Sequence, residues 1–157
     1  MSSAWETVCR LYAAPGVRGL CLDLQDQHGI DVPVLLTGGW LFTRGVALDA
    51  GRWTHLTASA AAWQTQVVAP LRAARRALLQ AAPPLGIAEA RALALKREVQ
   101  AVELAAERLQ IEALAETAAA WPATVRPPAG NFAALLPTLE ATRWVPLVAA
   151  VEAACRR

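Results

Sequence analysis

The fold is constrained most by two long segments of helical apolar spacing that are separated by a single sharp turn. Apolar or small residues recur every three or four positions between residues 54 and 120, on both sides of Ala82-Pro83-Pro84-Leu85-Gly86. Such spacing turns one face of a helix toward a packing partner. Two prolines followed by a glycine end a helix and reverse the chain. The sequence therefore predicts a long antiparallel helical hairpin over residues 54–120.

Each half of this hairpin has a predicted packing seam. The first half carries Leu56, Ala60, Trp63, Val67, Leu71, Ala74 and Leu78, and the second carries Ala88, Ala92, Leu95, Val99, Val102, Ala106, Leu109 and Ala113. The second set is close to a heptad repeat, which is typical of helices packed along their length. Pro70 predicts a kink, because it removes one backbone hydrogen bond. An aspartate at Val99 or Val102 would then be buried and destabilising.

Shorter helices are predicted on both sides of the hairpin. No alternation of apolar and polar residues reaches strand length, and alanine, the strongest helix former, is frequent throughout. We expect an all-α fold, a helical bundle of about six to seven helices in a single domain over residues 1–157. Short helices occupy 1–45, the hairpin 54–120, an irregular linker Trp121–Gly130, and a C-terminal helix broken by Pro137 and Pro146 occupies 131–156.

The first forty residues contain three predicted helices. One face of the first carries Trp5, Val8, Cys9 and Tyr12, and one face of the second carries Val17, Leu20, Cys21 and Leu24. Gly29 is a natural residue to end the second helix, and Asp31 with Pro33 is typical of the start of a third. The third is expected to bury Val32, Leu35, Leu36, Gly39 and Trp40. Gly38 and Gly39 leave room there for a neighbouring backbone or a ligand.

Composition points to the cytoplasm. The apolar run from Val32 to Phe42 is shorter than the roughly 20 residues that a membrane span needs, and the N-terminus has no pattern of a signal peptide. The chain has 3 cysteines without metal-binding spacing, which favours reduced thiols. Cys9 and Cys21 are expected to be buried, because both lie on predicted apolar faces.

The N-terminal pattern resembles a known family. The pattern consists of Trp5 and Tyr12, then Pro15-Gly16-Val17, then Cys21-Leu22-x-Leu24-Gln25-Asp26-x-x-Gly29-x-Asp31-Val32 with Leu35-Leu36 and Trp40. It is similar to the signature of an uncharacterised family of small bacterial proteins. The resemblance covers about forty residues and implies a domain of unknown function. Pro33 stands where the family pattern has asparagine, and Thr37-Gly38-Gly39 replaces a segment that contains phenylalanine. Any role of that asparagine is therefore absent here.

Polar side chains are concentrated between Cys21 and Val32. The candidate contacts for a ligand or partner are Asp23, Gln25, Asp26, His28, Asp31, Trp40 and His55. Carboxylates and imidazoles of this kind could bind a cation, and His55 beside Asp26 would form an acid–base pair. The alternative, which we favour, is structural: Asp31 caps a helix and His28 lies near a helix end, where its cationic form is favoured. We assign no catalytic residue, metal ligand or cofactor.

A second candidate is a basic patch near the hairpin turn, formed by Arg72, Arg75, Arg76, Arg91 and Lys96. Such a patch could receive phosphates or an acidic partner. However, the net charge is only +2, and no motif of a nucleic-acid-binding protein is present. We therefore expect a non-enzymatic interaction or regulatory protein that docks a protein partner through residues 21–32. The alternative is an enzyme or a small-ligand or metal-binding protein that uses Asp23, Asp26, His28 and His55.

Overall fold

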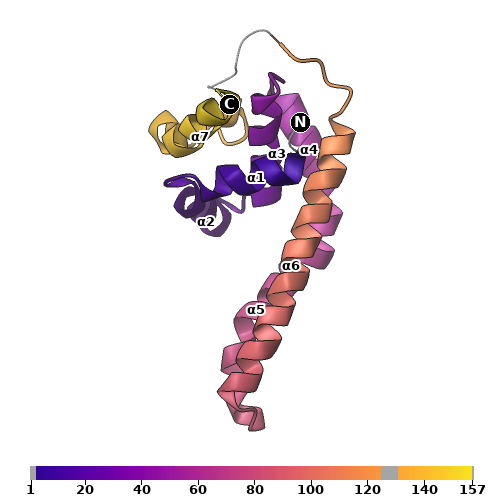
Figure 1. Cartoon of the computed structure of the whole chain (residues 1–157), viewed down its shortest axis with the longest axis vertical. Coiled ribbons are helices and arrows are strands. Elements are labelled where there is room, and N and C mark those ends of the chain that lie inside the picture. Colours follow the sequence, from indigo (N-terminus) through magenta and orange to yellow (C-terminus); the bar gives the residue numbers. More distant parts are fainter. Residues whose placement is uncertain (1–2, 125–130, 157) are drawn as a thin grey trace. The chain divides into compact units, whose positions relative to one another are not determined.

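The computed structural model describes residues 3–124 and 131–156, and this part of the chain is built from helices (Figure 1). The α-helices are α1 (Ala4–Ala13), α2 (Val17–His28), α3 (Val32–Thr43), α4 (Ala50–Trp63), α5 (Ala69–Ala81), α6 (Glu89–Thr117) and α7 (Val145–Cys155). Short turns are the π-helical η1 (Gln64–Val68) and the 3₁₀ segments η2 (Pro83–Leu85), η3 (Asn131–Ala134) and η4 (Ala141–Trp144). Within the described ranges, β-type pairing is limited to an isolated bridge between Val46 and Ala123. The all-α prediction is confirmed.

The chain divides into two compact units. The first comprises residues 1–60 and 111–157, and the second comprises residues 61–110. The divisions fall inside α4 and inside α6, and each unit has its own packing. Among the described helices, none is both long and apolar enough to cross a membrane.

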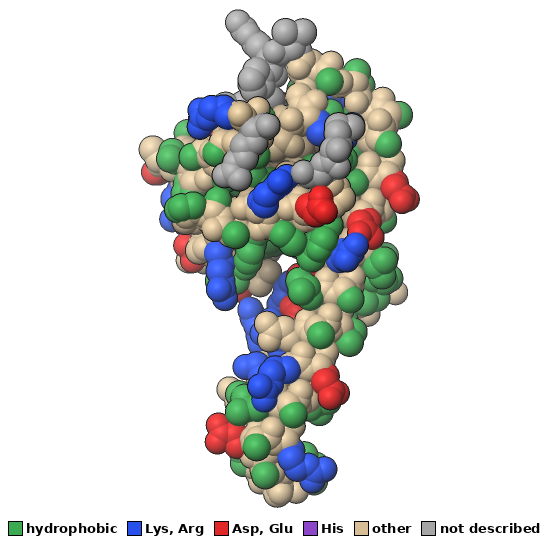
Figure 2. All heavy atoms as spheres, viewed as in Figure 1, with side chains coloured by type: hydrophobic (Ala, Val, Ile, Leu, Met, Phe, Trp, Pro, Cys, Tyr) green, Lys and Arg blue, Asp and Glu red, His purple; other side chains and the backbone are tan. Residues whose placement is uncertain are grey.

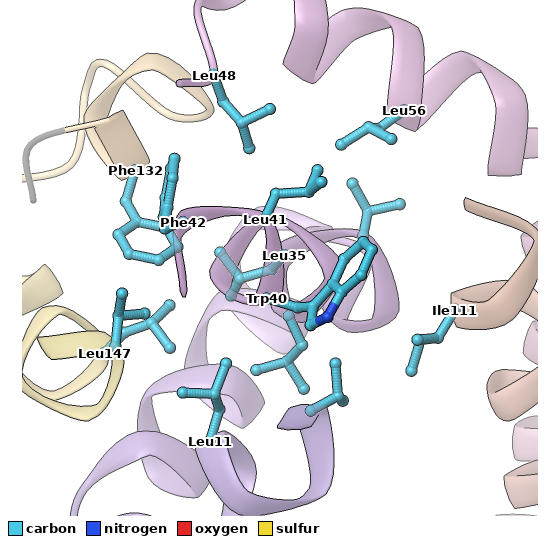
Figure 3. Close-up of a cluster of buried hydrophobic side chains, with 14 of the residues drawn as sticks. Leu11, Leu35, Trp40, Leu41, Phe42, Leu48, Leu56, Ile111, Phe132 and Leu147 are labelled. Carbon is cyan, nitrogen blue, oxygen red and sulfur yellow. The ribbon is translucent and has the colours of Figure 1, made fainter. Parts of the chain in front are cut away.

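Helix α3 forms the centre of the first unit and packs against α1, α2 and α7. Every residue from Pro33 to Phe42 is buried, so this helix has no solvent-facing stripe. It lies among aliphatic side chains of the surrounding helices, which include Leu11 of α1, Ile111 of α6 and Leu147 of α7 (Figure 3). A helix that is apolar on all sides must be enclosed by others, which explains its central position.

Aromatic rings join the C-terminal segment to this core. Phe42 lies edge-on to Phe132, with ring centroids 4.7 Å apart, and edge-on to Trp53 at 6.0 Å. Phe132 in turn stacks on Trp144 at 5.6 Å. Edge-to-face and offset arrangements at these separations are favourable. The four rings therefore hold η3 and η4 against α3 and α4.

The short N-terminal helices follow the predicted boundaries. The Ser3 hydroxyl accepts from the backbone N–H of Glu6, and the Glu6 carboxylate accepts from the N–H of Ser3, which forms a capping box at the start of α1. The buried face of α1 consists of Ala4, Thr7, Val8 and Leu11. The prediction for Cys9 was wrong, because this face is rotated by one position and leaves the thiol exposed. Cys21 is buried as predicted.

The C-terminal helix is not split by Pro146. The ring lies in the first turn of α7, where the missing N–H has no helical acceptor to lose. Pro146 thus begins the helix, and Leu147 and Val151 are buried as expected for its apolar face. The predicted linker is described only up to Thr124, where the N–H donates to the Gly45 carbonyl at 2.7 Å. Its remainder, residues 125–130, lies outside the described part of the chain.

The second unit contains the part of the predicted hairpin around its turn, with α5 and the N-terminal part of α6 side by side and joined through η2 (Figure 1). Pro70 is accommodated by the π-helical turn η1 immediately before it, in which the Ala69 N–H donates to the Gln64 carbonyl. Because proline has no N–H for the Gln66 carbonyl, widening the preceding turn is a way to absorb the disruption. Within this widened turn Val68 is buried and Val67, the predicted seam residue, is only half-buried.

Five of the eight residues of the seam predicted for the second half of the hairpin are exposed, Ala88 and Ala113 among them. Ala92 and Ala106 are buried and Val99 is half-buried, whereas Leu95, Val102 and Leu109 are 47%, 55% and 57% exposed. The inner face is completed instead by buried Glu103 and Gln110 and half-buried Lys96. One position along a helix is a rotation of about 100°. The face toward α5 is therefore centred on a polar heptad stripe, and the apolar stripe beside it remains outside.

Candidate functional site

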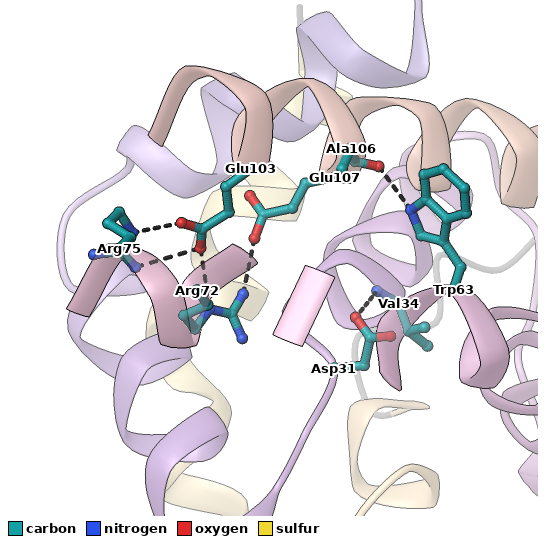
Figure 4. A network of polar contacts seen from close by, with 8 residues as sticks. All are labelled: Asp31, Val34, Trp63, Arg72, Arg75, Glu103, Ala106 and Glu107. Atoms are coloured by element: carbon teal, nitrogen blue, oxygen red, sulfur yellow. Dashed lines mark hydrogen bonds and ion pairs between the residues drawn. The ribbon is translucent and has the colours of Figure 1, made fainter. Parts of the chain in front are cut away.

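The corner between α2 and α3 is built from local capping. Gly29 adopts a left-handed backbone, with φ 63°, and its N–H and that of Ile30 both donate to the Leu24 carbonyl. Two residues later the Asp31 Oδ1 accepts from the N–H of Val34 at 3.4 Å, which caps α3 (Figure 4). The predicted helix end and helix start are both confirmed. Asp31 therefore has a structural role at this corner.

The other polar side chains of the corner lie mostly on its surface. Asp23, Asp26 and His28 are exposed, and Gln25 is half-buried. Asp23 makes an ion pair with Arg143 of η4 at 3.5 Å, which connects two segments far apart in the sequence. Among the residues that the structure describes, no group of three or more His, Cys, Asp or Glu side chains could hold a metal ion.

Two of the candidate residues lie away from this surface. Trp40 is buried in the core, and the guanidinium of Arg44 covers its ring at 5.1 Å. The ring of His55, on α4, lies 6.0 Å from the ring of Trp121, whose other neighbour is the Arg52 guanidinium at 5.1 Å. The space beside Gly38 is filled by the ring of Trp53, and a methyl of Leu11 lies against Gly39. The room left by these glycines is therefore used for close packing of the protein itself.

The hairpin contains a polar cluster that the sequence analysis missed (Figure 4). Arg72 Nε donates to Glu103 Oε1 at 3.1 Å, and Arg72 Nη2 donates to Glu107 at 2.9 Å. Arg75 Nε donates to Glu103 Oε2 at 2.5 Å. The Glu103 side chain is only 8% exposed, so this carboxylate depends on the two guanidinium groups for the solvation that it has lost.

The Arg–Glu cluster also determines the ionisation of Glu103. Burial alone raises the pKa of a carboxyl group, but hydrogen bonds and charge from Arg75 and Arg72 outweigh burial and hold the pKa of Glu103 below its usual range. The same hydrogen bond raises the pKa of Arg75. Both shifts favour the charged forms of Glu103 and Arg75 at neutral pH. The sequence signal that could have found this cluster is the heptad spacing of Lys96, Glu103 and Gln110.

The expected basic patch is therefore divided. Arg72 and Arg75 are engaged by Glu103 and Glu107, while Arg76 and Arg91 are exposed and Lys96 is half-buried. Two of the five cations face carboxylates of their own hairpin, so their charge is largely compensated. Anion binding at this patch stays a prediction.

Two exposed apolar residues were also missed. Leu22 is 40% exposed on α2, and Val145 is 59% exposed at the start of α7. Leu22 precedes Asp23, and Val145 follows Arg143 by two residues, so each is close in sequence to one member of the Asp23–Arg143 ion pair. The backbone of Gly16 also lies close to Pro146, and α2 packs against α7. We call Leu22, Asp23, Asp26, Arg143 and Val145 the α2/η4 face.

Comparison with known proteins gives one match. The profile of a family described as a protein of unknown function (DUF2390) matches residues 3–114, which is well over half of the chain. The match extends far beyond the forty residues on which the resemblance was first noted. No curated protein and no solved structure matches the chain.

Proposed function

We propose that this chain, which belongs to the DUF2390 family of proteins of unknown function, is a non-enzymatic interaction protein that docks a protein partner through the α2/η4 face. One observation carries the proposal. Leu22 and Val145, the exposed large apolar side chains among the described residues of the first unit, both lie within two residues of the Asp23–Arg143 ion pair. Apolar side chains surrounded by charged ones are typical of protein interfaces, where the charges form a polar rim.

The chemistry of residues 21–32 supports docking over catalysis. Asp31 caps α3 and Asp23 pairs with Arg143, so both carboxylates have structural partners. Trp53 and Leu11 occupy the space beside Gly38 and Gly39. The alternative of an enzyme or ligand-binding protein that uses Asp23, Asp26, His28 and His55 has less support, because the space that could have received a ligand is filled by the side chains of Trp53 and Leu11.

We further propose a cytoplasmic location in a bacterium. The three cysteines are present as free thiols, which suits a reducing compartment. The bacterial origin rests on the resemblance of the N-terminal motif to a family of small bacterial proteins.

The test is a pull-down from a lysate of the organism that encodes the chain, with intact protein and with the variants Leu22→Asp and Val145→Asp. Both positions are exposed, so each variant is expected to keep the helicity of the intact protein. Ser59→Asp is the matched control, because it adds the same charge at an exposed position of α4. We expect the control to retain a partner that both variants of the α2/η4 face lose. An identical set of captured proteins for all four samples would overturn the proposal.

A further inference from the structure

Exposed apolar side chains are concentrated on the hairpin. Among the residues that the structure describes, seven of the nine large hydrophobic side chains with substantial exposure belong to residues 61–110. The hairpin in Figure 2 accordingly shows hydrophobic side chains on its surface, interspersed with charged ones. Scattered exposed apolar residues are normal, but a regular row of them marks an interaction surface.

Three of these residues form such a row on α6. Leu95, Val102 and Leu109 are spaced by seven residues, or nearly two helical turns, and are each about half exposed. We call them the α6 stripe. The exposed small residues Ala101 and Ala105 lie beside it on the side away from the inner face of α6. Large apolar residues at heptad spacing, flanked by alanines, are suited to packing against another helix at close range.

We propose that the α6 stripe binds the same stripe of a second copy of this chain, with the two α6 helices antiparallel and the two-fold axis at Val102. Leu95 and Leu109 lie at equal distances in sequence on either side of Val102. Antiparallel pairing therefore places Val102 against Val102 of the second copy, and Leu95 against Leu109 of the second copy. Such an interface is self-complementary, as a two-fold symmetric contact must be.

Charge complementarity favours a second copy of this chain as the partner of the α6 stripe, and it favours an antiparallel arrangement of the two α6 helices. Glu98 and Arg108 are both exposed and lie on the same flank of the stripe as Ala101 and Ala105. Glu98 lies four residues before Val102 and Arg108 six residues after it, so antiparallel pairing places Glu98 within about one turn of Arg108 of the second copy along the helix axis. Symmetry repeats this opposite-charge pair on the other side of the axis. In a parallel pair Glu98 and Arg108 of the second copy stay ten residues apart along the axis, so this opposite-charge pair cannot form, and flanking charges of this kind set helix orientation.

The first experiment measures the mass of the full-length protein by sedimentation equilibrium over a dilution series. We expect a monomer–dimer equilibrium for the intact chain. Val102→Glu places two carboxylates against each other on the axis, so this variant should lose the dimer while its helicity is unchanged. Leu104→Glu is the matched control, because Leu104 is 52% exposed and lies about 200° around α6 from Val102. The control should dimerise like the intact chain.

The second experiment tests the charge pair. Glu98→Arg and Arg108→Glu should each weaken the dimer, because each brings like charges together at both symmetric positions. A mixture of the two variants should form heterodimers, in which every pair again has opposite charges. Weak self-association combined with restored association in the mixture is specific to antiparallel pairing.

The third experiment determines the register with cysteines, in a background in which the exposed Cys9 and Cys155 are replaced by serine. Val102→Cys should form a disulfide-linked dimer on mild oxidation. Leu95→Cys alone should not, but it should cross-link to Leu109→Cys in a mixed sample. Three results would each overturn the proposal: an intact chain that stays monomeric at the highest concentration, a Val102→Glu variant that still dimerises, or efficient cross-linking of Leu95→Cys to itself. None of them bears on the α2/η4 face, which is tested by partner capture.

Discussion

Gly38 of α3 lies directly against the indole ring of Trp53 of α4, and a methyl group on Gly38 would overlap the six-membered part of that ring. Trp53 is 1% exposed and has Phe42 as an edge-on neighbour. The glycine is therefore part of the packing of the largest fully buried side chain in the described structure. A tryptophan ring in a closed core has little freedom to move away from an added atom.

We therefore predict that Gly38→Ala destabilises the protein by roughly 2 kcal/mol or more, because overfilling a packed core displaces side chains from their preferred rotamers. Gly19→Ala in α2 is the control, since nothing lies within 4 Å of the position that its methyl group would occupy. That control should gain about 0.5–1 kcal/mol, because alanine is the better helix former. Urea denaturation of both variants checks the pair. Equal stability of the two would show that Trp53 can move aside.

The Arg–Glu cluster predicts a dependence of stability on pH. The pKa of Glu103 is lower in the folded chain than in the unfolded chain, so its contribution is fully present above the unfolded value of about 4.3. That contribution is lost as the pH falls through the folded pKa. Glu103→Gln should lower the free energy of unfolding at pH 7 by about 1–3 kcal/mol, because Arg75 loses its carboxylate partner and Arg72 keeps only Glu107.

The difference between Glu103→Gln and the intact protein should shrink on acidification, since Glu103 then becomes neutral in both states of the intact chain. Unfolding free energies from denaturant titrations at several acidic pH values measure this convergence. Glu152→Gln is the control, because Glu152 is exposed on α7, and its curve should follow that of the intact protein. A constant difference between Glu103→Gln and the intact protein down to the lowest pH would contradict the ion-pair account.

Replacements of Asp31 test its role as the cap of α3. Asp31→Ala should cost about 1 kcal/mol, because the N–H of Val34 loses its acceptor at the start of α3. Asp31→Asn should retain most of the stability, since an amide oxygen can accept the same hydrogen bond. Thermal unfolding followed by circular dichroism checks both variants. A stable Asp31→Ala variant would mean that the cap contributes little at its 3.4 Å distance.

The cysteines should differ sharply in reactivity. Burial raises the pKa of Cys21 to about 12, whereas Cys9 and Cys155 are exposed. The thiolate is the reactive form, so a chromogenic disulfide reagent should modify two thiols quickly in the folded protein. The third should react only after unfolding, and raising the pH from 7 to about 9 should not release it. Rapid modification of all three thiols without denaturant would show that α2 opens readily.

Local sequence signals predicted the boundaries of the short helices well. Gly29 ends α2 and Asp31 caps the start of α3, as their residue types favour. Both were predictable because capping depends on groups a few residues apart. The buried face of α2 was also predictable, since Val17, Leu20, Cys21 and Leu24 are its only regular apolar stripe. The predicted buried face of α1 differs from the observed one by one residue position, because Trp5 and Tyr12 are amphipathic and remain half-buried at the edge of that face.

The candidate surfaces were much less predictable. The Asp23–Arg143 ion pair joins residues 120 positions apart, and the Arg72–Glu103 pair joins residues 31 apart. No local pattern reports such pairs, because each member is an ordinary surface charge in its own segment. The contacts of Gly38 with Trp53 were likewise invisible, since the sequence shows only that space is available.

By itself the sequence determined where the short N-terminal helices begin and end and that the chain reverses at Pro83-Pro84. Only the tertiary structure decided which side of α6 turns inward. Two heptad stripes lie one residue apart on this helix, the apolar Leu95, Val102 and Leu109 and the polar Lys96, Glu103 and Gln110. Hydrophobicity alone favours burying the first. Arg72 and Arg75 of α5 reverse that preference, because their guanidinium groups stabilise a buried Glu103 and leave the apolar stripe outside.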